Sequence, residues 1–299
     1  MTSQALTQDR STAVLAGIGL AIAAYFCFSS QDALIKWLVD GASVWQILFM
    51  RSLTIFVLSL ASGRGKVIRA VARTPTFRGL ILRASLMLSA WLLFYNAARE
   101  LPLADLETLY FAAPLIVTLL AAPLLGERVG LVRWGATLLG FGGVVVACAA
   151  EASGVSLAAG MALAAAALWA LSYVLLRRIS EAETTQVQMV VINGFFLIAC
   201  GIALPWVWTP VAPSHLALMG LIGVVGGGGQ FLLYESVRRA PASALAPFEY
   251  TALLWAFLYS YAIWNHAPSS NVVVGALMIV ASGLVVFVRE VRDMRRPLA

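Results

Sequence analysis

The chain has 299 residues, of which 61% are apolar and only 11% charged, whereas an ordinary soluble domain carries about 25% charged residues. This composition excludes an ordinary soluble domain and indicates a membrane protein. The net charge of +6 could suggest nucleic-acid binding, but no basic patch is interleaved with aromatic stacking residues, so no nucleic-acid partner is expected.

Ten apolar stretches follow one another along the chain, and each is long enough to cross roughly 30 Å of hydrocarbon as a helix. They cover residues 13–38, 43–62, 79–98, 103–125, 132–150, 155–177, 184–204, 215–237, 242–264 and 271–289. The first stretch is too long for the apolar region of a cleaved signal peptide, so we expect it to remain as a membrane helix. The sequence therefore predicts an all-α membrane protein with ten transmembrane helices.

Basic residues fall almost entirely in alternate loops. Placing the N-terminus in the cytoplasm puts both chain ends and the basic segment 62–83 inside the cell, and only Arg99 falls in an outer loop. Lys36 and Arg51 fall within spans. This asymmetry follows the positive-inside rule. We therefore expect a multi-pass protein of a bacterial cytoplasmic (inner) membrane, surrounded by the lipid bilayer, with both termini in the cytoplasm.

An internal repeat relates the two halves of the chain. The sequence YNAARELPLADLETLYF at 95–111 matches YESVRRAPASALAPFEY at 234–250 at a constant offset of 139, so that Tyr95 aligns with Tyr234. Five spans separate equivalent helices, and because five is an odd number the two halves must cross the membrane in opposite senses. Inverted repeats of this kind place a binding site near the middle of the bilayer, between the halves.

The repeated segments also resemble a known family. The segment LPLADLETLYFAAPLIVTLLAAPLLGERVGLVRWGATLLGFGGVVV resembles the EamA module of the drug/metabolite transporter superfamily, and ALAPFEYTALLWAFLYSYAIW followed by VVVGALMIVASGLVV is similar. The second copy departs from the first in having Asn265-His266 where the first has Gly126-Glu127. The resemblance implies a ten-helix exporter, similar to exporters of amino acids including aromatic ones, built from two five-helix repeats at 13–150 and 155–289.

Glu249 is the most conspicuous ionisable residue in the predicted spans, because it lies about seven residues into the ninth span with no basic residue near it in sequence. A carboxylate inside a membrane costs several kcal/mol unless it is paired or hydrated. Pro247 loosens the same turn, since proline cannot donate a backbone hydrogen bond. The carboxylate suits the amino group of a substrate or a coupling proton. The alternative is a hydrogen bond to a neighbouring helix that only fixes packing.

Asp32, Lys36 and Arg51 are ionisable residues within the first two spans. Asp32 and Lys36 lie four residues apart on one helix face and could pair with each other, and Lys36 could also reach the membrane surface. Arg51 lies too deep to remain unpaired, so we expect Asp32, Asp105 or Glu107 as its partner. Arg51 could either hold neighbouring helices together or bind a ligand.

Aromatic and polar residues recur at i, i+4 spacing in equivalent helices of the two halves, which puts each pair on one helix face. The pairs are Trp91 and Tyr95 against Gln230 and Tyr234, and Phe28 and Asp32 against Trp169 and Tyr173. Together with Tyr110, Glu249 and Tyr250 they form the predicted substrate-binding set. A cavity lined by these groups would bind amphipathic zwitterions with apolar or aromatic side chains by stacking and cation–π contact. Core packing alone is the alternative.

The glycine-rich and cysteine residues do not indicate a cofactor. The run GVVGGGGQF at 223–231 lies within a span and is not followed by Lys-Ser/Thr, so it is not a phosphate loop. It would make its helix bendable or allow another backbone to approach closely. Cys27, Cys148 and Cys200 lie inside spans without metal-ligand spacing. We expect no cofactor, no metal site and no catalytic residue.

Several function classes are compatible with these patterns. The leading hypothesis is a secondary transporter that exports amino acids by alternating access, with Glu249, Asp32 and Glu107 as candidates for proton coupling. A membrane enzyme acting on a lipid-linked substrate would need clustered His, Asp or Ser at one membrane face, whereas the two histidines, His215 and His266, lie at outer helix ends. A channel and a drug or nucleotide-type metabolite transporter of the same fold are further alternatives. Glycines of the fifth span could serve helix packing or a dimer face, so a monomer and a homodimer are both open.

Overall fold

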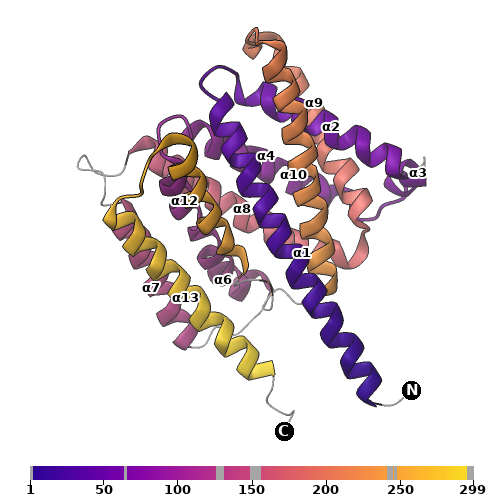
Figure 1. Ribbon diagram of the computed structural model, residues 1–299. Coiled ribbons are helices and arrows are strands. Elements are labelled where there is room, and N and C mark those ends of the chain that lie inside the picture. Colours follow the sequence, from indigo (N-terminus) through magenta and orange to yellow (C-terminus); the bar gives the residue numbers. More distant parts are fainter. Residues whose placement is uncertain are drawn as a thin grey trace.

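The structure is a computed structural model that describes residues 3–63, 66–125, 131–148, 156–240, 245 and 248–294. Every regular element within these ranges is a helix, and the helices form one bundle (Figure 1). The first half of the chain contributes α1 (Ser3–Leu38), α2 (Val44–Gly63), α3 (Lys66–Ala72), α4 (Phe77–Ala97), α5 (Leu103–Tyr110), α6 (Ala112–Leu125) and α7 (Leu131–Cys148). The second half contributes α8 (Leu157–Ala182), α9 (Thr185–Val207), α10 (Pro213–Arg239), α12 (Thr251–Trp264) and α13 (Ser270–Met294).

The helices have the length and the surface of membrane spans. Six of them, α1, α2, α4, α8, α9 and α10, contain apolar stretches long enough to cross a bilayer, and α7, α12 and α13 contain shorter apolar stretches. Large apolar side chains such as Ile198, Ile202 and Leu277 are mostly exposed on the outside of the bundle, where lipid would cover them. The chain is therefore an all-α, multi-pass membrane protein, as its composition predicts.

The two halves pack against each other in a reciprocal pattern. The first helix of each half lies along the third helix of the other, since α1 packs on α10 and α8 packs on α4 (Figure 1). Second helices meet as α2 and α9, and fifth helices meet as α7 and α13. The start of α1 and the end of α13 lie at the same end of the bundle (Figure 1). This pairing is what a duplicated five-span unit requires, and it confirms the two-repeat fold.

The fourth span of each half is interrupted at the same place in the repeat. In the first half, Phe111 (φ −68°, ψ 3°) separates α5 from α6, because Pro114 cannot donate a backbone hydrogen bond to the carbonyl of Tyr110. In the second half, Tyr250 (φ −64°, ψ −12°) precedes α12 and is equivalent to Phe111 at the offset of 139. The expectation of one continuous helix over 103–125 is therefore wrong.

The ninth span also differs from the expected helix over 242–264. Leu245, Phe248 and Glu249 are helical, Tyr250 forms a turn and α12 begins at Thr251, so Glu249 lies at the end of a helical segment, directly before the interruption. Pro247, the expected cause of local loosening, lies outside the described residues, as do Gly126 and Glu127 of the family motif.

Other helices extend beyond the expected spans. Helix α1 already begins at Ser3, α8 continues to Ala182 and α13 to Met294, because a helix that leaves the membrane keeps its backbone hydrogen bonds in water. The basic segment 62–83, which the charge pattern assigned to the cytoplasmic side, contains α3 and the first two turns of α4. Arg83 therefore belongs to a membrane helix, which places it inside the bundle.

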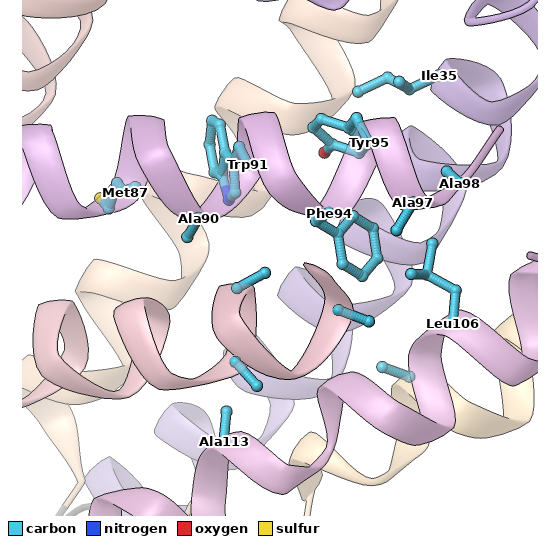
Figure 2. Packing of buried hydrophobic residues seen from close by; sticks show 14 of the residues in the cluster. Ile35, Met87, Ala90, Trp91, Phe94, Tyr95, Ala97, Ala98, Leu106 and Ala113 are labelled. Carbon is cyan, nitrogen blue, oxygen red and sulfur yellow. The ribbon is translucent and has the colours of Figure 1, made fainter. Parts of the chain in front are cut away.

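Small residues allow the helices to approach closely. A Cβ atom added to Gly143 of α7 would lie 2.7 Å from the carbonyl oxygen of Gly275 in α13, so these glycines serve packing between the two halves. On α4, Trp91 and Tyr95 project from one side while Phe94 projects from another (Figure 2). Helix α4 therefore contacts helices of both halves of the chain.

Candidate functional site

Three helices bring two carboxyl groups and a tyrosine together. Asp32 of α1 accepts a hydrogen bond of 2.7 Å from the Tyr95 hydroxyl of α4 and one of 3.3 Å from Nε2 of Gln31. The Glu107 carboxyl of α5 lies beside Asp32 within side-chain hydrogen-bonding distance. Tyr95 and Glu107 are buried. Asp32, which is half-buried, and the buried Glu107 therefore form a carboxyl pair between α1, α4 and α5.

Arg51 of α2 is joined to this carboxyl pair through a neutral amide. Its Nε donates to Oε1 of Gln31 at 2.6 Å, and its guanidinium carbon lies 4.3 Å from the centre of the Trp91 ring. The expected direct pairing with Asp32, Asp105 or Glu107 is not what the structure shows. Gly226 of α10 explains the arrangement, because a Cβ atom there would overlap Oε1 of Gln31 and lie 3.0 Å from Nε of Arg51.

Lys36 does not pair with Asp32 either. Its Nζ donates to the backbone oxygens of Ala98 and Leu101, at 2.7 Å each, and lies 5.8 Å from the centre of the Trp264 ring. The Ala98 carbonyl, at the C-cap of α4, carries partial negative charge that attracts the ammonium group, and the Leu101 carbonyl in the connection to α5 is the second acceptor. Lys36 lines a cavity of about 240 Å³ near the ends of α4 and α12, together with Glu100, Leu101, Pro102, Leu103, Ser260, Trp264 and His266.

A second polar cluster is centred on α10 of the other half and includes Arg83 of α4. The Tyr234 hydroxyl accepts hydrogen bonds from Nη1 of Arg83 at 2.9 Å and from Nε2 of Gln230 at 2.8 Å. Nδ2 of Asn193 donates to Oε1 of Gln230 at 3.4 Å. Gln230 and Tyr234 are the repeat equivalents of Trp91 and Tyr95, so each half builds a polar cluster at the same position. The burial of Arg83 was not predicted, because the charge pattern assigned this residue to the cytoplasmic side. The apolar residues on both sides of Arg83 in the sequence could have indicated that it lies within a span.

Glu249 is held by tyrosines from both halves. Its carboxylate accepts hydrogen bonds from the hydroxyls of Tyr25 in α1 and Tyr173 in α8. Tyr173 belongs to the predicted set, whereas Tyr25 was missed because no repeat partner marks it. Tyr110 interacts electrostatically with Glu249 and also with the carboxyl pair. Tyr110 thus lies between the two acidic parts of the site.

Aromatic rings surround Tyr110. The centre of its ring lies 4.9 Å from that of Phe94 and 6.4 Å from that of Trp169. We call Phe94, Tyr110 and Trp169 the aromatic cluster. It draws on α4, α5 and α8, so both halves contribute to it. Phe94 was not predicted, because it faces the other side of α4 from the Trp91 and Tyr95 pair (Figure 2).

The remaining predicted residues lie around this centre. Trp91 packs edge-on against Phe196 at 5.4 Å, and Phe28 lies edge-on to Tyr25 at 6.3 Å. Tyr250 turns away, because its hydroxyl lies against Gly283 of α13. The structure therefore brings together Asp32, Tyr95, Tyr110, Trp169, Tyr173 and Glu249, places Trp91, Phe28, Gln230 and Tyr234 in adjoining layers, and directs Tyr250 elsewhere.

These features define a class of protein. Two like halves with an apolar exterior enclose carboxyl groups, hydroxyls and aromatic rings at their interface, which is the architecture of a secondary transporter. Among the described residues, no group of three or more His, Cys, Asp or Glu side chains could hold a metal ion. The arrangement can bind a cationic group, stack on an apolar or aromatic group and exchange protons.

Comparison with known proteins gives the family. The model of the EamA-like transporter family matches residues 15–148 and again residues 153–288. The chain belongs to this family, and it is accordingly a transporter and not an enzyme.

The relatives transport different small molecules. The chain is 28% identical to a protein of Rhizobium johnstonii named riboflavin transporter, over 99% of both chains. It is 27% identical to a pseudopaline exporter of Pseudomonas aeruginosa, over 89% of this chain and 94% of the relative. It is 24% identical to an S-adenosylmethionine uptake transporter of Rickettsia conorii, over 96% and 98%. A solved crystal structure covers 96% of this chain and 99% of its own at a TM-score of 0.64 and 21% identity, which supports the fold alone.

Proposed function

We propose that the chain exports small metabolites, amino acids with aromatic or apolar side chains among them, from the bacterial cytoplasm across the inner membrane. Both termini would lie in the cytoplasm. The repeats at 13–150 and 155–289 would act as two halves that rock against each other around the site, exposing it to one side of the membrane at a time. The site contains no described metal ligand cluster, and we assign it no cofactor.

The observation that carries this proposal is the position of Glu249. Its carboxylate lies at a helix interruption and contacts Tyr25 from one half and Tyr173 from the other. A group bound to Glu249 would therefore change hydrogen bonds with both halves of the protein. An ammonium group satisfies a buried carboxylate that two hydroxyls already orient, because it supplies both charge and further hydrogen-bond donors.

The aromatic cluster supports an apolar or aromatic side chain as the other end of the cargo. Tyr110 interacts electrostatically with Glu249 and stacks at an angle on Phe94 and Trp169. Ring pairs with centres 4.5–7 Å apart are favourable, and a flat or branched apolar group inserted among them would gain the same contacts. The combination of one carboxylate and several rings favours an amphipathic cation or zwitterion.

Riboflavin is a second candidate cargo. The relative named riboflavin transporter matches 99% of this chain, and the aromatic cluster could also stack on a planar ring system. Glu249 distinguishes the two candidates, because an ammonium group would pair with its charge whereas a neutral ring system would leave that charge unused.

Counterflow into proteoliposomes tests the proposal. Purified protein would be reconstituted into liposomes preloaded with unlabelled cargo, and uptake of labelled tryptophan, phenylalanine, leucine, riboflavin and S-adenosylmethionine would be compared with protein-free liposomes. We expect accumulation of at least one aromatic amino acid and its reduction by Trp169→Ala. Trp206→Ala is the matched control, since Trp206 is 80% exposed. Accumulation of no amino acid would contradict the proposal, and riboflavin alone would support the second candidate.

The direction of transport needs a separate measurement. Energised cells that express the chain should lose preloaded labelled amino acid faster than cells without it. Faster uptake from the medium with unchanged loss would contradict export.

A further inference from the structure

Arg51 remains unexplained by the site described so far. We propose that Arg51 is the residue that binds the carboxylate of the cargo, through its Nη1 and Nη2 atoms. This inference rests on the proposed function and deepens it, because it requires the cargo to carry an anionic carboxylate as well as the group bound by Glu249.

The guanidinium is buried and incompletely bonded. Arg51 is 0% exposed, yet within the described part of the chain neither Nη1 nor Nη2 has a hydrogen-bond partner. Buried charges are ordinarily paired, because an uncompensated one is strongly destabilising. Asp32 interacts with this guanidinium electrostatically, but no protein acceptor among the described residues bonds Nη1 or Nη2, and these two nitrogens form one edge of the guanidinium group.

The orientation of the guanidinium is fixed by the rest of the side chain's contacts. Nε donates to Gln31 at 2.6 Å, and the guanidinium carbon lies 4.3 Å from the centre of the Trp91 ring. These contacts leave the Nη1 and Nη2 atoms for a ligand. A guanidinium edge with two donors matches the two oxygens of a carboxylate.

Comparison of the two halves argues against a purely structural role. The repeat equivalent of Arg51 is Asn193, 142 residues later, which is also buried and bonds to Gln230 and to the backbone oxygen of Met189. The same place between helices is thus occupied in the other half by an uncharged side chain. Packing at this position does not require a charge, so the arginine in the first half needs another explanation.

Arg51 also differs from the other buried arginine. Nη1 of Arg83 donates to the Tyr234 hydroxyl at 2.9 Å, and its guanidinium lies 4.9 Å from the centre of that ring. Both arginines are buried and stacked on an aromatic ring, but only Arg83 has an Nη atom bonded to a protein group among the described residues. Arg83 is therefore the natural control for Arg51.

Hydrogen bonds and electrostatic interactions link Arg51 to the remainder of the site. Gln31 joins Arg51 to Asp32, Asp32 and its neighbour Glu107 interact with Tyr110, and Tyr110 interacts with Glu249. A zwitterion could then have its carboxylate at Arg51, its ammonium group on the acidic side and its side chain in the aromatic cluster. Trp91 covers Arg51 in this conformation, so its ring must move when the ligand enters.

Ligand-induced stabilisation of the purified protein in detergent tests the inference. The shift in unfolding temperature would be measured with tryptophan and with tryptophan amide, which keeps the ring and the amino group but has no carboxylate. The wild type should be stabilised by tryptophan at concentrations about tenfold or more below those of the amide. Arg51→Gln should lose this preference and respond to the two ligands alike, whereas Arg83→Gln should keep it.

Each outcome is informative. A wild type that responds to both ligands equally, or an Arg51→Gln protein that keeps the wild-type preference, would overturn the inference while leaving amino-acid transport intact. A wild type that responds to no amino acid and shows no amino-acid counterflow would instead refute the proposed function. Should Arg51→Gln fail to fold, the wild-type preference and Arg51→Lys, which keeps the charge but loses the two-donor edge, still decide the question. Preference retained in full by Arg51→Lys would contradict binding through that edge.

Discussion

The rings of Phe111 and Tyr250 lie 5.4 Å apart, and each residue marks the point where the fourth span of its half is interrupted. Tyr110 and Glu249 immediately precede these two residues and are equivalent in the repeat. The two interruptions therefore meet at the interface between the halves, and each one positions a site residue there. Irregular backbone within a membrane is tolerated where it is buried in protein or lines a cavity, which explains why the breaks coincide with the site.

Contact between the two interruptions should be measurable as a coupling energy. We expect Phe111→Ala and Tyr250→Ala each to destabilise the protein, with an interaction of about 0.5–1.5 kcal/mol in the double-mutant cycle. The measurement is thermal unfolding in detergent. Tyr261→Ala serves as the control, because Tyr261 is 60% exposed and should not couple to Phe111. Additive effects of the Phe111 and Tyr250 substitutions would mean that the contact does not join the halves.

Neighbouring glycines of α10 should differ in their tolerance of a methyl group. Gly226→Ala should cost about 1–3 kcal/mol, because the new Cβ would overlap Oε1 of Gln31 and displace it from Arg51. Gly228→Ala should be neutral or stabilising by up to about 1 kcal/mol, since no atom lies within 4 Å of the added Cβ. Unfolding temperatures of the two variants would give the comparison. Equal tolerance at both positions would argue against the close approach of α10 to Gln31.

Glu107 should matter for proton-driven transport more than for exchange. Two carboxyl groups in hydrogen-bonding contact hold a proton between them, as Asp32 and Glu107 are placed to do. Glu107→Gln keeps the size and a hydrogen bond but removes one proton-binding group. Counterflow without a gradient should survive, whereas accumulation driven by a pH gradient should disappear.

The control for Glu107 is Asp40→Asn, at an exposed position after α1. It should leave both modes of transport unchanged. Gradient-driven accumulation by Glu107→Gln at the wild-type level would exclude the pair as the coupling site.

Contacts at the end of the bundle that we assign to the cytoplasm connect the two halves. The Glu183 carboxylate, after α8, accepts hydrogen bonds from the hydroxyls of Thr74 and Thr76, before α4. Glu183→Ala should favour separation of the halves at this end by on the order of 1 kcal/mol, or roughly fivefold in population. Spin labels at Ala70 and Ala182 would report a larger share of long distances. Gln186→Ala, at an exposed position of α9, should leave the distance distribution unchanged, and an unchanged distribution in Glu183→Ala would contradict the role of this contact.

The spans could be predicted because the length of each apolar stretch is visible in the sequence. The repeat could be predicted because residues of the two halves match at a constant offset. These patterns also placed Asp32, Tyr110, Tyr173 and Glu249 in one set, since a carboxylate or an aromatic pair at repeated positions is visible without coordinates. The partners of those residues were less predictable. Gln31 is uncharged and gives no signal in a search for buried ions, yet it occupies the place between Arg51 and Asp32 that Gly226 leaves free.

Arg83 and Lys36 show the limits of charge counting. Topology assigned Arg83 to a basic cytoplasmic segment, whereas it is 1% exposed and bonded to Tyr234. Helical spacing suggested that Lys36 could pair with Asp32, whereas the carbonyls of Ala98 and Leu101, in the connection between α4 and α5, accept its hydrogen bonds. In both cases the deciding group comes from a segment remote in sequence, so only the packed structure could identify it.

Counterflow by Glu249→Gln tests the central claim most directly, because this substitution keeps the size of the side chain and one acceptor oxygen but removes its charge. Glu235→Gln is the matched control, since Glu235 is a carboxylate at the end of α10 that pairs with Arg239 at 3.1 Å. We predict that Glu249→Gln lowers counterflow of aromatic amino acids about tenfold or more and that Glu235→Gln stays near the wild type. Wild-type counterflow by Glu249→Gln would contradict a binding site centred on this carboxylate between the two halves.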